Sequence, residues 1–136
     1  MINEEMQWSF VVPLENYTNI DEVQNNFKIL LPKELVELIK QNNGGYPKKN
    51  KHCSIDEFGE TDFKCLLSFN KNDDDNIFDS LEYFINKYNG MLIPFAIDSG
   101  SGYYCISDKG IIFFSEADEK TYYIANDINE FFKILF

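Results

Sequence analysis

A helix bounded by its own start and stop signals constrains the fold of this chain most strongly. Leu31-Pro32 precedes it, and the run 42–47 (NNGGYP) follows it. Proline fixes φ in a range that suits the first helical turn, whereas glycine tolerates the left-handed conformation that ends a helix. Between these signals Leu35, Leu38 and Ile39 recur at helical spacing, so one face of the predicted helix should be buried.

Three further helices are predicted from stripes of apolar residues at helical spacing. One begins near Asn19, one covers 76–89 and ends at Asn89-Gly90, and one begins at Asp127. The Asp127 carboxylate can cap the last helix, where Glu130 completes a capping-box-like pair. The buried stripes consist of Ile20, Val23 and Phe27 in the first; Ile77, Leu81, Phe84, Ile85 and Tyr88 in the second; and Ile128, Phe131, Phe132 and Leu135 in the third.

Short β-rich runs account for most of the remaining chain. Residues 7–12 have the pattern of a strand, and alternating apolar residues within 52–69 indicate two strands joined near Gly59. Four more strands are predicted after short turns, at 92–97, 103–107, 111–114 and 121–125. Such short connections favour antiparallel pairing. Because helical runs and strand runs are segregated, the sequence predicts an α+β fold in a single domain over residues 1–136.

One hydrophobic core is expected from the apolar sides of these elements. A chain of 136 residues can bury roughly two thirds of its unfolded surface without metals or disulfides. The residues assigned to this core are Leu35, Leu38, Leu81, Phe84, Ile106, Phe113, Phe131 and Phe132.

The charge balance excludes one class of function. The chain carries 23 acidic and 12 basic side chains, a net charge of −11, and every basic residue is a lysine. Nucleic-acid binding draws most of its affinity from neutralising phosphates, and arginine supplies the planar fork that recognises phosphate and guanine. Direct nucleic-acid binding is therefore not expected.

Cysteine usage and hydropathy indicate a cytoplasmic protein. Cys53, Cys65 and Cys105 are an odd number at no metal-like spacing, and the first residues lack a basic segment followed by an apolar one. No apolar run approaches the length of a membrane span. We therefore expect free thiols in a reducing compartment and no contact with a membrane.

Two motifs suggest catalysis or metal binding and fail on inspection. His52, the only histidine, adjoins Cys53, but neighbouring residues on a strand point to opposite faces, which aims a nucleophile pair poorly. The run 70–75 (NKNDDD) suggests a calcium loop, but Asp75 stands where the turn needs glycine and Leu81 where a bidentate glutamate is needed. These acids have two other interpretations, stabilising the following helix through its dipole or contacting a basic partner. No metal or cofactor is expected.

Two other patterns are equally unspecific. The run 98–102 (DSGSG) could cradle a phosphate, but a β-rich run follows it where a helix would be needed, which favours a simple turn. Acid pairs such as Asp56/Glu57 and Glu60/Asp62 could perform acid/base chemistry, but acids are so abundant here that spacing does not single them out.

Several motifs in a fixed order give the chain its resemblance to the SMI/KNR family of the SUKH superfamily. They are WSFVVPL at 8–14, Leu31-Pro32, NGGYP at 43–47, LLSFN at 66–70, IPFAID at 93–98, IAN at 124–126 and Phe131-Phe132. This resemblance covers nearly the whole chain and implies a sheet with helices packed on one side. The turn at 99–105 departs from the family's usual Asp-x-Gly-Asn-x-Ile-Cys pattern, close to the expected binding face.

The resemblance implies that the protein is an immunity protein that binds and blocks a toxin, often a nuclease. The acidic charge favours the same interpretation, because a nuclease presents a basic surface towards which an acidic inhibitor is steered. A regulatory or scaffold module and a small hydrolase with two acids in one pocket are the alternatives. We expect the toxin to contact an acidic, tyrosine-containing face formed by Tyr46, Asp56, Asp73, Asp74, Asp75, Asp98 and Tyr103.

Overall fold

A five-stranded antiparallel sheet organises the fold. The computed structural model describes residues 6–88 and 92–136. Strands that follow one another in the chain are also neighbours in the sheet, and each pair is antiparallel. The strands are β5 (Cys65–Leu66), β6 (Ile93–Ile97), β7 (Gly102–Ser107), β8 (Gly110–Ser115) and β9 (Lys120–Ala125). The predicted α+β class with an antiparallel sheet is confirmed.

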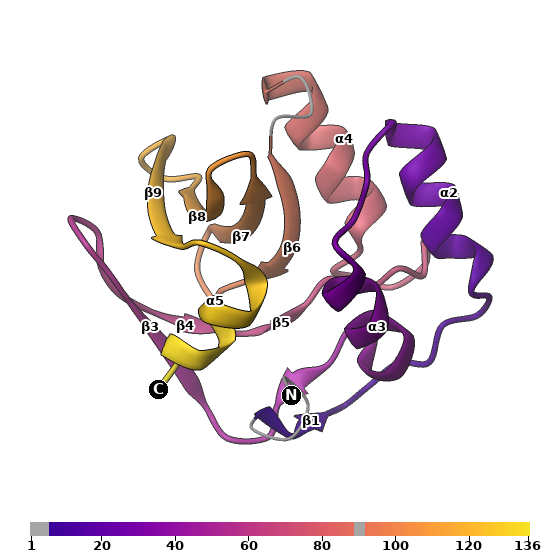
Figure 1. The fold of residues 1–136 in the computed structure, drawn as a ribbon, viewed down its shortest axis with the longest axis horizontal. Coiled ribbons are helices and arrows are strands. Elements are labelled where there is room, and N and C mark those ends of the chain that lie inside the picture. The colour runs from indigo at the N-terminus through magenta and orange to yellow at the C-terminus, as the bar shows by residue number, and fades with distance from the viewer. Residues whose placement is uncertain (1–5, 89–91) are drawn as a thin grey trace.

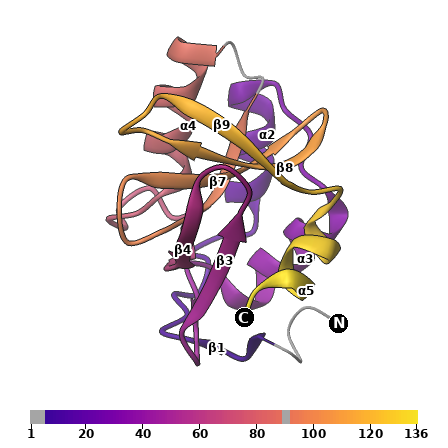
Figure 2. The same cartoon turned by 90° about the vertical axis from the view of Figure 1, so that its left-hand side faces the viewer.

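Two small antiparallel pairs complete the β-structure. β3 (Lys51–Ile55) and β4 (Gly59–Phe63) form the predicted hairpin, with the turn just before Gly59. It lies beneath β7, β8 and β9 in Figure 2. β1 (Trp8–Ser9) pairs with β2 (Tyr46–Pro47), so the strand predicted over 7–12 has only two residues. That prediction was wrong because Phe10 has φ of +55°, which interrupts extended backbone.

Four helices are described: α2 (Thr18–Phe27), α3 (Lys33–Asn42), α4 (Ile77–Tyr88) and α5 (Ile128–Ile134). α3 follows Pro32, and Gly44 adopts φ of +67° just after its end, as predicted. The Asp127 carboxylate caps α5 by accepting a hydrogen bond from the Glu130 N–H at 2.8 Å. The predicted end of α4 at Asn89-Gly90 lies outside the described residues, as does the side chain of Tyr88.

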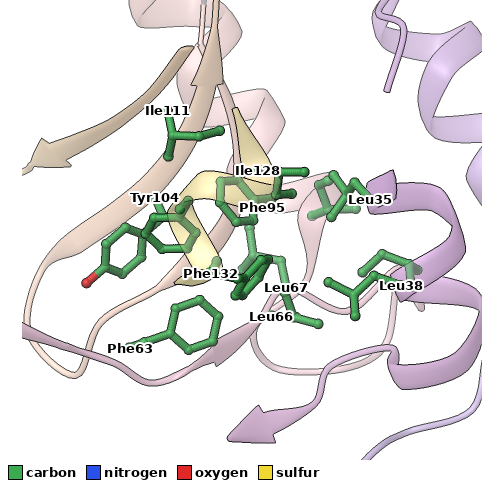
Figure 3. Packing of buried hydrophobic residues seen from close by; sticks show 14 of the residues in the cluster. Leu35, Leu38, Phe63, Leu66, Leu67, Phe95, Tyr104, Ile111, Ile128 and Phe132 are labelled. Carbon is green, nitrogen blue, oxygen red and sulfur yellow. The ribbon is translucent and has the colours of Figure 1, made fainter. Parts of the chain in front are cut away.

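The main hydrophobic cluster lies where one face of the sheet meets α3, α5 and the hairpin. Phe131 of α5 lies against Tyr104 and Phe95, with ring centroids 5.1 and 5.6 Å apart, and Phe63 of β4 stacks on Tyr104. Leu35 and Leu38 enter the same cluster from α3 (Figure 3). The other two of these ring pairs meet edge-on and tilted, and stacked and edge-on pairs are the arrangements that aromatic rings prefer.

A second, smaller cluster covers the other face of the sheet. Successive residues of a strand point to opposite faces, so Tyr103 and Phe114 face away from Tyr104 and Phe113. Phe84 of α4 packs against Tyr103 and Phe114 at 5.1 and 5.2 Å between ring centroids. The other buried members of this cluster are Leu92, Cys105 and Ile112.

The expectation of one core is therefore corrected, because the described residues form two hydrophobic clusters. Six of the eight predicted core residues are buried in the main cluster, and Ile106 is half-buried against it. Phe84, although fully buried, belongs to the second cluster. α4 contributes to both clusters, because Leu81 is buried in the main one and Phe84 in the second. In Figure 1, α2, α3 and α4 lie to the right of β6, and α5 lies below β6, β7, β8 and β9.

Candidate functional site

A cleft of about 470 Å³ lies between the start of α4 and the turn that joins β6 to β7. Its walls are rich in acids: Asp74, Asp75, Asp79, Asp98 and Glu116 line it, together with one basic residue, Lys64. Its negative potential follows directly from this imbalance.

The turn between β6 and β7 is held by the buried carboxylate of Asp98. Its Oδ1 accepts hydrogen bonds from the N–H groups of Gly100 and Gly102, at 3.1 and 2.8 Å, and its Oδ2 accepts one from Thr61 Oγ1 at 2.6 Å. At Gly102 a Cβ atom would lie only 2.0 Å from the Phe113 ring, so the close backbone approach requires glycine. The run 98–102 is thus the predicted turn, stabilised by one acid.

The acidic run before α4 divides into residues with different roles. Asp73 accepts hydrogen bonds from Ser68 Oγ at 2.5 Å and Asn70 Nδ2 at 3.3 Å, whereas Asp74 is exposed. Asp75 pairs with Lys64 at 3.5 Å. The cap of α4 is Asn76, whose side-chain oxygen accepts a hydrogen bond from the Asp79 N–H. The cap is therefore an asparagine and not one of the three acids, and its Nδ2 also donates a hydrogen bond to the Asp73 carbonyl at 3.0 Å.

Lys64 keeps its positive charge inside this acidic cleft. Burial lowers its pKa and the adjacent Asp75 raises it, and the net change is upward. The ammonium group therefore stays protonated at neutral pH and offsets part of the negative charge beside Asp75.

Two tyrosines form the aromatic wall of the cleft. Tyr83 of α4 and Tyr103 of β7 are stacked, with ring centroids 6.3 Å apart and an angle of 19° between the rings. Burial, reinforced by the charge of Glu116, raises the pKa of Tyr103, so its hydroxyl stays neutral. The wall combines apolar ring surface with hydroxyl groups, a combination enriched at protein interfaces.

Four of the seven predicted contact residues meet in this cleft: Asp74, Asp75, Asp98 and Tyr103. The other three lie elsewhere. Tyr46 is half-buried in β2, and Asp56 is exposed in the hairpin turn. Asp73 accepts the hydrogen bonds from Ser68 and Asn70 described above. Contact of any of the seven with a toxin remains a prediction.

Sequence reasoning missed several residues of the cleft, among them Asp79, Tyr83 and Glu116. Asp79 and Tyr83 are four residues apart, which places them on one face of α4, so helical spacing could have found them. Glu116 follows β8 and reaches the cleft only through the folding of the sheet, and no local pattern signals it.

The cysteines and the histidine form no nucleophilic pair. Cys53 is buried, and burial raises the pKa of its thiol to about 11, which keeps it protonated at neutral pH. His52 lies beside it on β3 and is half-exposed, with its Nδ1 3.9 Å from a Glu60 oxygen. A protonated, buried thiol is a poor nucleophile.

Buried acids and clusters of metal-ligating side chains are scarce among the described residues. Asp98 is their single buried acid, so the pair of buried acids that would indicate a hydrolase is not formed among them. Within 6–88 and 92–136, no three His, Cys, Asp or Glu side chains are grouped as metal ligands. None of the helices in those ranges has the length and apolar character needed to cross a membrane.

The chain belongs to the SMI1 / KNR4 family (SUKH-1), whose family model matches residues 17–134. This family is known for immunity proteins and related regulators, and it is generally non-catalytic. Its members interact with toxin partners in general. No curated protein matches this chain.

Proposed function

We propose that this protein is a non-catalytic immunity protein that binds and neutralises a basic toxin, a nuclease, through the acidic cleft. The observation that carries this proposal is the cleft itself, where five carboxylates and the stacked tyrosines meet around one lysine. Family membership supplies the class of function, and the cleft supplies the chemistry of the surface.

Charge complementarity explains why the partner should be basic. A nuclease must attract the phosphates of its substrate, so its active surface carries lysine and arginine. The same surface is drawn towards an acidic cleft on a chain with a net charge of −11. An inhibitor seated there covers the nuclease surface that the substrate needs.

Two exposed acids of the cleft allow a clean test of electrostatic steering. Asp74 and Glu116 are exposed, so their charges can be removed without disturbing Asp73, Asp75 or Asp98, which bond within the chain. The double variant Asp74→Asn/Glu116→Gln should associate about tenfold more slowly with the toxin domain encoded beside this protein's gene, measured at low salt. The difference should shrink at high salt, where exposed charges are screened.

A control variant carries the same change of charge away from the cleft. Glu34 in α3 and Asp108 in the β7–β8 turn are both exposed and lie outside the cleft lining. Glu34→Gln/Asp108→Asn should associate at nearly the wild-type rate. Equal slowing by both double variants would show that net charge acts without any contribution from the cleft.

Co-expression tests the immunity role itself. Cells that produce the neighbouring toxin should survive with the wild-type protein, and purified wild type should bind the toxin domain. If the wild type neither binds nor protects, the immunity role is lost. The regulatory role known in the same family would then be the better account.

A further inference from the structure

An exposed aromatic residue occupies a strained position in the loop after β1. The side chain of Phe10 is 81% exposed, and its backbone has φ of +55°. This left-handed region is unfavourable for bulky residues, which crowd the neighbouring carbonyl there. An exposed ring gains little burial in return, so stability of the fold does not explain a phenylalanine at this position.

The surrounding structure holds this loop in place. Before Phe10, the Gln7 carbonyl accepts a hydrogen bond from the Lys48 N–H at 2.7 Å. After it, Val12 makes two hydrogen bonds with Asn43, one from its N–H and one to its carbonyl, both 2.9 Å long. Asn43 is only 1% exposed. Backbone strain that is held by its surroundings in this way is concentrated at functional sites.

Tyr46 connects this loop to the acidic cleft. The rings of Phe10 and Tyr46 meet edge-on, with centroids 5.9 Å apart. The carbonyl of Gly45, the residue before Tyr46, accepts a hydrogen bond from the Leu66 N–H at 3.0 Å, which places β2 beside β5. Lys64, which directly precedes β5, lines the cleft, so Phe10 and Tyr46 lie on the side of β5 next to it.

We propose that Phe10 is an apolar anchor that inserts into a pocket beside the basic surface of the partner. This inference rests on the proposed function and adds a second contact to it. The cleft binds positively charged side chains of the partner, and Phe10 packs against its apolar surface. Anchors of this kind are aromatic, few in number and responsible for much of the binding energy. A second copy of this chain is disfavoured as the occupant, because its acidic cleft would face another acidic surface.

The test compares Phe10→Asn with Leu30→Asn, using the purified toxin domain encoded beside this protein's gene. Asparagine tolerates positive φ, so Phe10→Asn should keep or raise the melting temperature, by about 2 to 5 °C at most. Its complex should dissociate about tenfold to hundredfold faster. Leu30 is 85% exposed and has no positive φ, so Leu30→Asn should leave both quantities near the wild-type values.

Each outcome separates this inference from the proposed function. Phe10→Tyr, which keeps the ring, should restore slow dissociation, as expected of an anchor. If the wild type binds and Phe10→Asn binds equally well, the anchor is rejected and the immunity role stands. If the wild type does not bind the toxin domain, the proposed function is rejected, and the anchor that rests on it is rejected with it. A dimeric wild type that Phe10→Asn converts to a monomer, with toxin binding unchanged, would assign Phe10 to self-association and reject the anchor.

Discussion

The two faces of the five-stranded sheet bury aromatic side chains on very different scales. One face, with α3, α5 and the β3–β4 hairpin, contributes to the main cluster around Phe131 and Tyr104. The other buries five residues, Phe84 of α4 among them, and its border tyrosines line the acidic cleft. We therefore expect packing on the first face to provide more of the stability than packing on the second.

The largest effect is expected on the first face. Phe131 is fully buried and contacts the rings of Phe63, Phe95, Tyr104 and Phe132. Phe131→Ala should therefore cost about 4 to 5 kcal/mol of unfolding free energy, measured by urea denaturation. Phe131→Leu, which retains more volume, should cost less. A loss below roughly 2 kcal/mol would mean that this cluster does not dominate stability.

A smaller loss is expected on the second face. Phe84 is also fully buried, but its cluster is small and borders solvent through Tyr83 and Tyr103. Phe84→Ala should cost about 3 kcal/mol, because nearby side chains can partly fill the space. It should also slow toxin association, since Tyr103 rests on Phe84. A cost equal to that of Phe131→Ala, measured in the same urea titration, would erase the contrast between the faces.

The smallest effect concerns the ion pair over the second face. Lys87 lies over the rings of Tyr83 and Phe114 and hydrogen-bonds to Glu119, which lowers the pKa of Glu119 below its ordinary value of 4.5. A lowered folded-state pKa means that the pair stabilises the protein above pH 4.5. That stabilisation disappears as pH falls through the folded-state pKa.

Glu119→Gln tests this pH dependence. At pH 7 and low salt the variant should melt no more than about 2 °C below the wild type, because exposed pairs contribute little. The difference should vanish in acid and at high salt. Asp108→Asn, which removes an exposed acid of the β7–β8 turn, should show no such pH-dependent difference. A gap that persists at pH 3 would indicate a contribution from packing.

Local patterns were enough to predict most of the helices and strands, because their signals lie within a few residues of one another. Pro32 and Gly44 bound α3 as predicted, Gly59 follows the hairpin turn, and Asp127 caps α5. Short β-rich runs between turns also predicted β6, β7, β8 and β9, whereas β5 falls within the second of the two strands predicted over 52–69. The residues at 7–12 are the exception, since the positive φ of Phe10 depends on hydrogen bonds from distant Asn43 and Lys48.

What covers each face of the sheet, and which acids face solvent, depends on contacts that form only in the folded protein. Alternation shows that Phe113 and Phe114 point in opposite directions, but it does not show that α5 meets one and α4 the other. Asp74 and Asp98 are alike as carboxylates, yet one is exposed and the other is buried with three hydrogen bonds. The physical reason is that burial and pairing depend on contacts between residues far apart in the chain, which no local pattern encodes.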